Sequence, residues 1–199
     1  MRLARIFMLA LTLCPGLAPA AAAEQAASVT RLSGSAQAGG QALRPGSALA
    51  SGDRLTTGPA SRLELRFTDG TTVVLGESSD FTIAEFVHAP AANAGTAHFR
   101  VETGVFLVTT GAVAKLPGRP LSVATPVASI GVRGTRFWGG SLDHPLDVLL
   151  LDGAITVHSR GGSVELDHPL DGTDVTAANA APTPAGRWKQ ERVEKALRS

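Results

Sequence analysis

The sequence has 199 residues, 44% of them hydrophobic and 5% aromatic, with 22 Gly, 12 Pro, no Tyr and a net charge of +1. This composition excludes a wholly disordered chain, favours short strands joined by turns over long helices, and argues against a broad stacking platform for bases or sugars. Two of the 18 Lys and Arg residues lie in the first 23 positions and five in the last 13, which leaves 11 basic against 15 acidic residues between them. A body with a charge of about −4 is not expected to bind nucleic acid.

Residues 1–23 have the pattern of a signal peptide. Arg2 and Arg5 form a basic start, residues 6–13 form an apolar core, and residues 21–23 are a small-residue cleavage site. The sequence therefore predicts an exported protein, periplasmic or secreted. No other apolar run approaches the ~20 residues needed to span a bilayer.

The one cysteine, Cys14, lies inside this segment. Ordinary cleavage is favoured over lipid attachment there, because Leu13 stands where lipidation signals have a small residue. The mature chain would then have neither disulfides nor thiol chemistry.

Residues 51–76 form the stretch with the clearest strand pattern. From 63 to 68 apolar and polar residues alternate, which places successive side chains on opposite faces of a sheet. Asp69 and Gly70 then supply a reversal, because Gly adopts a positive φ without steric cost and Asp tolerates one.

The buried face selects the register behind this reversal. A two-residue loop would place Val73 and Leu75 opposite charged residues. A three-residue loop with Gly70 in the left-handed conformation pairs Leu65 with Val73 and Leu63 with Leu75, so we expect this register.

Short strands continue along the rest of the chain. A loop at Gly161-Gly162 would pair Val157 with Leu166. Strand patterns thus extend from about residue 29 to residue 175, and we expect an all-β domain at residues 24–175. The further predicted strands lie at residues 29–36, 42–43, 81–85, 99–101, 105–107, 121–123, 146–151 and 154–157.

Two more glycine motifs are predicted to shape the fold. Asp152-Gly153 has the composition of a second reversal between two apolar strands. Gly131 and Gly134 lie where a side chain would clash or be forced to a positive φ.

The hexapeptide Leu-Asp-His-Pro-Leu-Asp occurs twice, at residues 142–147 and 166–171. The offset of 24 residues matches one turn of a β-solenoid, in which each coil buries its apolar face against the next. With the many short strands, it favours a β-solenoid or roll.

The same repeat carries the candidate metal ligands. His144 and His168, each with two neighbouring aspartates, would offer ligands for a divalent ion on stacked corners. The alternative is a structural corner in which Asp accepts backbone N–H bonds and Pro fixes the bend. We favour the structural corner, because no third histidine is held at metal spacing.

The composition changes after the last predicted strand. Residues 176–186 are rich in Ala and Pro and are predicted to be a flexible linker. Residues 187–199 are basic and helix-like, with apolar residues loosely on one side. So short a helix is marginal alone. The alternatives are that it is frayed or that it docks on a partner or on an anionic membrane surface, which would be the one membrane contact expected.

Arg133, Arg136 and Trp138 form the most prominent local cluster. Arg and Trp are enriched where protein partners bind, so the cluster is a candidate partner-binding site. The alternative, which the adjacent glycines favour, is that Arg133 satisfies buried carbonyls at a bend while Trp138 covers an end of the core.

Two motifs together carry a resemblance to a known family. GDRLTTGPASRLELRFTDGTTVVLG at 52–76 and ATPVASIGVRGTRF at 124–137 resemble the FecR-like domain, the periplasmic module of iron-dicitrate sensor proteins. The resemblance covers about residues 29–157 and implies a β-solenoid-like fold that contacts other envelope proteins. In sensors the domain signals to a cytoplasmic anti-sigma segment. In this sequence a signal peptide stands in place of that segment, so the resemblance implies a binding module and not direct transmembrane signalling.

Catalysis is not expected. No G-x-S-x-G elbow is present, and the glycines at 131–134 lack the Lys and the helix of a phosphate-binding loop. We expect a non-enzymatic envelope binding module without a cofactor. The alternatives are a cell-wall or glycan-binding module, which the scarcity of aromatics disfavours, and a metal protein using the two LDHPLD corners.

Overall fold

A computed structural model describes residues 24–118 and 121–199, and the predicted signal peptide lies outside these residues. The described chain is mostly β, with sixteen strands hydrogen-bonded into one sheet and one short α-helix. The all-β prediction is confirmed. None of the helices in the described ranges combines the length and the apolar character that crossing a bilayer requires.

The elements follow one another closely. The strands are β1 Gln25–Ser33, β2 Ala36–Ala38, β3 Gln41–Ala42, β4 Ala48–Ala50, β5 Arg54–Thr57, β6 Arg62–Phe67, β7 Thr72–Leu75, β8 Asp80–Ala89, β9 Ala94–Thr103, β10 Phe106–Thr109, β11 Leu121–Ala124, β12 Ser129–Gly140, β13 Leu146–Ser159, β14 Gly162–Leu166, β15 Asp171–Val175 and β16 Gly186–Arg187. The helices are the 3-10 turns η1 Pro90–Ala92 and η2 Val113–Lys115 and the α-helix α1 Gln190–Arg198.

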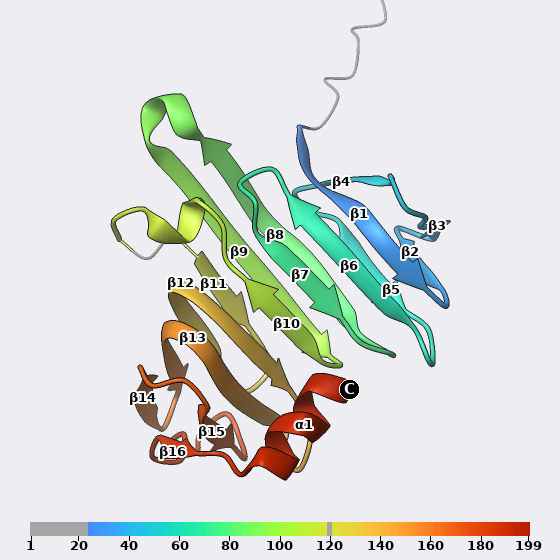
Figure 1. Ribbon diagram of the computed structural model, residues 1–199. Helices are drawn as coiled ribbons and strands as arrows, with labels where there is room; N and C mark the ends of the chain where they lie inside the picture. Colours follow the sequence, from blue (N-terminus) through green and yellow to red (C-terminus); the bar gives the residue numbers. More distant parts are fainter. Residues whose placement is uncertain (1–23, 119–120) are drawn as a thin grey trace, which may run out of the picture.

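The sheet is open and curled, so that it folds over its own core (Figure 1). The strand order is β3-β2-β5-β8-β9-β11-β12-β10-β7-β6-β1-β4, and β13 continues from β12 to carry β14 and β15. Of the strand pairs in the described ranges, β9 with β11 is parallel and the others are antiparallel. The solenoid expectation is therefore corrected to a curled sheet, because short loops such as the one after β6 return the chain beside the strand it has just left.

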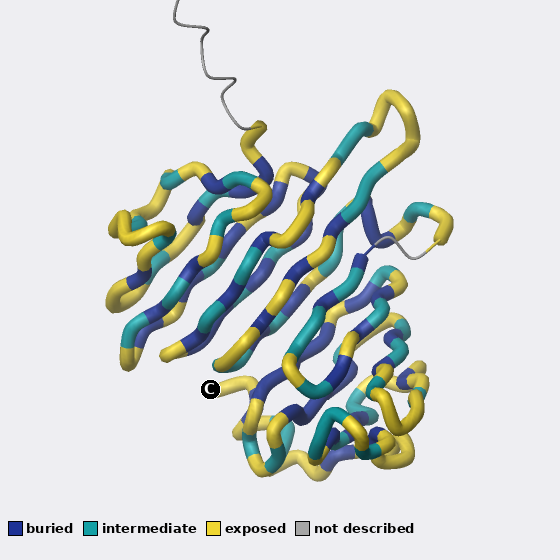
Figure 2. The backbone as a smooth tube through the Cα atoms, turned by 180° about the vertical axis from the view of Figure 1, so that it is seen from behind, coloured by how far each residue is buried: buried dark blue, intermediate teal, exposed yellow. Residues whose placement is uncertain are grey.

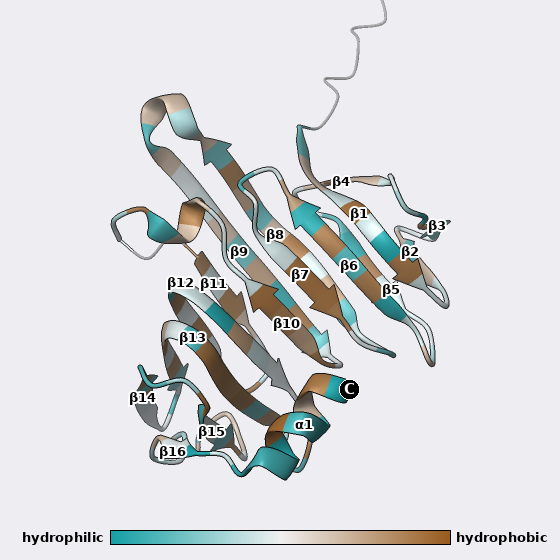
Figure 3. Cartoon of the chain, in the orientation of Figure 1, coloured by the Kyte–Doolittle hydropathy of each residue, from teal (hydrophilic) through white to brown (hydrophobic). Residues whose placement is uncertain are grey.

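The core lies inside the curl. Polar and apolar residues alternate along β6 (Figure 3), and buried and exposed positions alternate along the strands (Figure 2). Three phenylalanines from three strands meet there, with ring centroids 4.8 Å apart for Phe67 and Phe99 and 5.5 Å apart for Phe81 and Phe99. Burial of these alternate side chains is the main force that stabilises the curled sheet.

The predicted register of the central hairpin is confirmed. Leu63 lies opposite Leu75 and Leu65 opposite Val73, and Gly70 has a φ of +88° in the loop. The buried Asp69 has a further role that the sequence did not predict, because its carboxylate also accepts the N–H of Val113 in η2 at 3.1 Å. The loop is thus tied to a segment 44 residues further along the chain.

The second predicted reversal is wrong. β13 runs without interruption through Asp152 and Gly153. Gly153, at a φ of +85°, lies opposite Gly134, at +58°, in an irregular stretch of the β12–β13 pair, where a Cβ on Gly153 would overlap the carbonyl oxygen of Gly134. These two glycines thus form facing bulges that kink two long strands rather than ending them.

The prediction for Gly131 is also wrong. Gly131 is not among the residues with positive φ, and the nearest atom to a Cβ built there is 3.9 Å away. Gly131 lies in a regular part of β12 opposite Thr156, where a side chain has room.

The loop between β13 and β14 is displaced from its predicted position. Ser159 pairs with Gly162 and Val157 with Val164, so the two loop residues are Arg160 and Gly161. The pairing shifts by two residues, which leaves the same side chains on the same faces. The hydrophobic pattern alone does not distinguish the two registers.

Residues 176–186, predicted to be a flexible linker, are hydrogen-bonded along the sheet. The Ser159 hydroxyl donates to the carbonyl of Ala180 at 2.6 Å, and the Thr173 hydroxyl donates to the carbonyl of Thr183 at 2.7 Å. The predicted helix is present as α1, which lies against the outward side of β12 and β13 (Figure 1). The domain boundaries at 175 and 186 stay predictions.

Candidate partner-binding face

The helix α1 covers an apolar patch on the outer side of the sheet, which we call the tail face. Leu107, Trp138 and Leu149 lie side by side on β10, β12 and β13 because their registers match. Their chain neighbours, such as Phe137 and Leu150, point into the core instead. The tail face consists of Val105, Leu107, Trp138, Leu149 and Leu151.

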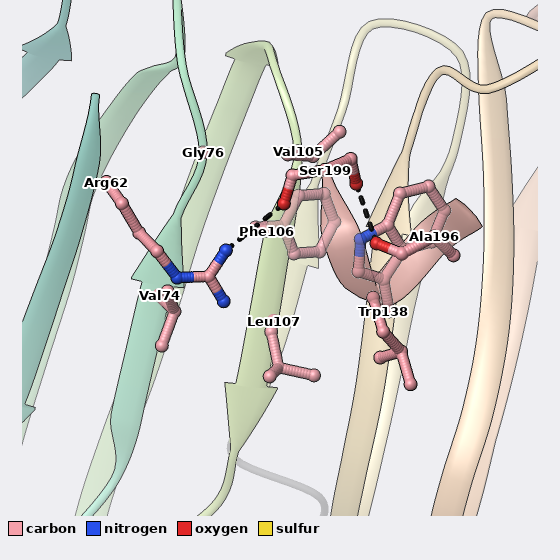
Figure 4. A pocket seen from close by; sticks show the side chains of 10 residues that line it. Arg62, Val74, Gly76, Val105, Phe106, Leu107, Trp138, Ala196 and Ser199 are labelled. Carbon is pink, nitrogen blue, oxygen red and sulfur yellow. Dashed lines mark hydrogen bonds between the residues drawn. The ribbon is translucent and has the colours of Figure 1, made fainter. Parts of the chain in front are cut away.

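The C-terminal segment, residues 187–199, packs closely on this face. Trp188 lies against Trp138 with ring centroids 6.3 Å apart at 64°, and Ala196 is fully buried. At the end of α1 a cavity of only about 10 Å³ separates the helix from the sheet (Figure 4). Arg62 donates to the carbonyl oxygen of Ser199 at 3.2 Å across the same gap.

Beside the tail face lies a group that we call the acidic corner, made of Asp143, His144, Asp147 and Asp174. The guanidinium of Arg192 from α1 enters it, with Nη2 2.9 Å from Asp147 Oδ1 and 2.6 Å from Asp174 Oδ1. Its carbon lies 3.8 Å from the ring centroid of Trp188, a cation–π contact. Lys195 adds an ion pair to Asp143 at 2.9 Å.

Asp147 is the centre of the acidic corner. Its Oδ2 accepts the backbone N–H groups of Leu142, Asp143 and His144 at 2.8 to 3.1 Å, and its Oδ1 lies 2.8 Å from His144 Nδ1. Burial of Asp147 opposes ionisation, but the hydrogen bonds from these residues outweigh it and hold the pKa of the Asp147 carboxyl below its usual range. The carboxylate is therefore an anion fixed in place by its own loop.

The two candidate metal ligands, His144 and His168, lie in different surroundings. His144, Asp147 and Asp174 have ligand atoms within 4.8 Å of one another, whereas His168 joins no such group in the described ranges. His168 lies on an exposed loop at the other end of β15. Since Arg192 fills the His144 group, a divalent ion could bind there only by displacing the guanidinium.

The predicted partner-binding cluster is divided between two environments. Arg133 and Arg136 are exposed on β12, and Arg133 borders a surface hollow beside η2. Trp138 is 2% exposed because α1 covers it. The three residues therefore do not form one open patch.

The sequence did not indicate a role for Arg192 or for Asp174. In the structure these two residues form the shortest ion pair between α1 and the acidic corner. The signal that could have found them is the opposite charge of the acidic body and the basic tail.

The sequence model of the family described as FecR protein matches residues 53–156, which is 104 of the 199 residues. The chain belongs to the FecR protein family. The FecR match begins at β5 and ends within β13, so it includes the strands that build the tail face but not α1. No curated protein matches the chain.

The fold of this FecR chain is similar to two crystal structures of a protein from Parabacteroides distasonis ATCC 8503 that is provisionally described as an anti-sigma factor. For the 1.65 Å and 2.50 Å structures alike, the TM-score is 0.57, the identity is 17% and the match covers 72% of this chain. It spans 64% and 63% of those chains. At this identity the likeness establishes the fold.

Proposed function

We propose that this protein is a non-enzymatic FecR binding module that lies outside the cytoplasm and contacts a protein partner of the cell envelope, in a signalling role. The observation that carries the proposal is the FecR match over residues 53–156. These residues build a hydrogen-bonded sheet whose outer side carries both apolar and charged residues.

One row of outward side chains is the surface we assign to this contact. Arg66, Thr72, Thr109 and Arg136 lie opposite one another across β6, β7, β10 and β12. Both arginines are exposed, and the row borders the tail face. Arginines beside apolar residues are typical of protein interfaces.

The signalling role is supported by the similar structures, since that bacterial protein is provisionally described as an anti-sigma factor. The location outside the cytoplasm is supported by the signal-peptide pattern of residues 1–23. The non-enzymatic role is supported by the acidic corner, whose charges are already paired by Arg192 and by backbone N–H groups. Charges held in this way are structural rather than poised for chemistry.

Site-specific photocrosslinking in intact cells tests the proposal. A photoreactive residue at Thr109 is expected to capture one defined envelope protein, because Thr109 lies in the middle of the row. The same residue at Glu102, exposed on β9, is the control for a different part of the sheet. Cell fractionation checks the location.

Two results would overturn the proposal. One is a photoreactive residue at Thr109 that captures no envelope protein at native abundance, or captures only the proteins that the Glu102 control also captures. The other is turnover of a small molecule that is lost when a single polar side chain is changed.

A further inference from the structure

We propose that the tail face and the acidic corner together form a binding site for a basic amphipathic helix of a partner protein, and that α1 is a built-in competitor for this site. The inference rests on the proposed function, because it names the chemistry of the partner. The site holds its own tail in the closed form and a partner helix in the open form.

The site is organised independently of the helix that occupies it. Trp138 and Leu149 are fixed by strand pairing within β12 and β13. The Asp147 carboxylate is oriented by three N–H groups of its own loop, not by Arg192. A site that keeps its shape when empty loses little conformational freedom on binding a new ligand.

The resident helix is a weak ligand for this site. α1 has nine residues, and no side chain caps its N-terminus. The Nε of Arg192 is buried without a hydrogen-bond partner and lies 3.7 Å from the nearest Asp143 oxygen. A helix this short is marginal in water, so α1 gains its order from docking and would lose it on release.

The contacts define what a competing helix must supply. The aromatic residue, Trp188, lies just before α1, whereas the arginine and the small residue, Arg192 and Ala196, lie four residues apart within α1. The aromatic ring packs on Trp138, the guanidinium pairs with Asp147 and Asp174, and the small residue allows close approach to the sheet. A partner helix whose arginine also satisfies its Nε would outcompete α1.

Binding of a peptide in trans tests the inference. The full-length chain with Ala196→Glu is the open form, because a carboxylate at this buried position expels α1. The probe is a fluorescein-labelled peptide of residues 186–199, measured by fluorescence anisotropy. We expect it to bind the open form at least tenfold more tightly than the wild-type chain, whose site is occupied.

Matched variant peptides distinguish binding at this site from non-specific binding. The peptide with Arg192→Ala should lose most of this affinity, whereas the peptide with Glu191→Ala, an exchange at an exposed position, should keep it. Asp174→Asn in the open form should weaken binding of the unaltered peptide. If Ala196→Glu does not give a folded chain by circular dichroism, Arg192→Asp in the full-length chain provides a second open form, since it places like charges together.

Three results would overturn the inference. These are equal affinity of the folded open and wild-type chains, equal binding of the Arg192→Ala peptide, and dimerisation of the open form by light scattering, which would make a second copy the occupant. Failure here with successful crosslinking from Thr109 removes this inference alone. Loss of crosslinking with intact peptide binding removes the proposed function instead.

Discussion

The same six residues, Leu-Asp-His-Pro-Leu-Asp, adopt two different structures in this protein. At 142–147 the final aspartate, Asp147, is fully buried and accepts three backbone N–H groups of its own loop. At 166–171 the histidine side chain is 77% exposed, and Leu170 has a left-handed φ of +72°. Identical local sequence therefore does not fix the shape of the corner.

The difference comes from partners distant in sequence. The first copy is completed by Arg192, which lies 45 residues after Asp147. In the second copy Leu170 donates its N–H to the carbonyl of Leu150 at 2.8 Å and accepts the N–H of Trp188 at 2.9 Å. The first copy thus contacts its distant partner through a side chain, and the second copy contacts its distant partners through its backbone. Tertiary contacts therefore determine which of the conformations open to the motif each copy adopts.

The largest expected difference between the copies is at the final aspartate. Asp147→Ala leaves three N–H groups without an acceptor and Arg192 with fewer partners, so we expect a loss of about 3 to 5 kcal/mol of unfolding free energy. Asp171→Ala should cost less than about 1 kcal/mol. Urea unfolding followed by circular dichroism measures both, and equal losses would show that the two corners are equivalent.

The leucine before each aspartate gives the next largest contrast. Leu146 is 2% exposed, and Leu146→Ala should cost about 3 kcal/mol through the cavity it leaves. Leu170→Gly should be neutral within about 1 kcal/mol, because relief of the left-handed backbone offsets the loss of a half-buried side chain. Thermal unfolding compares the two, and a large loss at Leu170 would contradict the backbone account.

Acid should act on the first copy through Asp147. Its pKa is lowered in the folded state, so the stability it contributes is present above the unfolded value of about 3.9 and is lost as pH falls through the folded value. The unfolding free energy of the wild-type chain should therefore decline more steeply below about pH 4 than that of Asp147→Asn. Urea titrations between pH 6 and pH 2 measure the slope, with Asp171→Asn as the matched exchange, and parallel slopes for wild type and Asp147→Asn would contradict this.

The smallest expected difference is at the histidines. His144→Ala removes a hydrogen bond to the buried Asp147 and should cost about 1 kcal/mol, whereas His168→Ala should cost less than about 0.5 kcal/mol. Differential scanning calorimetry at pH 7 compares the variants. A larger effect at His168 would reverse the ranking of the two corners.

The part of the fold that could be predicted from sequence depends on local burial patterns. The register of the β6–β7 hairpin followed from the need to bury Val73 and Leu75 on the same side as Leu65. Asp152-Gly153 has the same two residues as the Asp69-Gly70 turn, yet it lies within β13. The deciding feature is the facing bulge at Gly134, which only the pairing of β12 with β13 reveals.

The candidate site was less accessible to sequence reasoning. Trp138 was recognised as notable, but its cover by α1 depends on contacts between residues about 50 positions apart. The opposite charges of the basic tail and the acidic body predict that the two attract each other, but not where on the body the tail binds. The position is set by Asp147 and Asp174, which strand pairing between β13 and β15 places opposite each other.

The Asp147 carboxylate links two events through one group. One oxygen holds the loop of residues 142–144, and the other holds Arg192. By reciprocal linkage, an event that stabilises that loop also favours the guanidinium by the same free energy, and release of the guanidinium lowers the stability of the loop by that amount while the three N–H bonds keep its shape. Through this single buried anion, release of the C-terminal segment therefore changes the stability of the connection between β12 and β13.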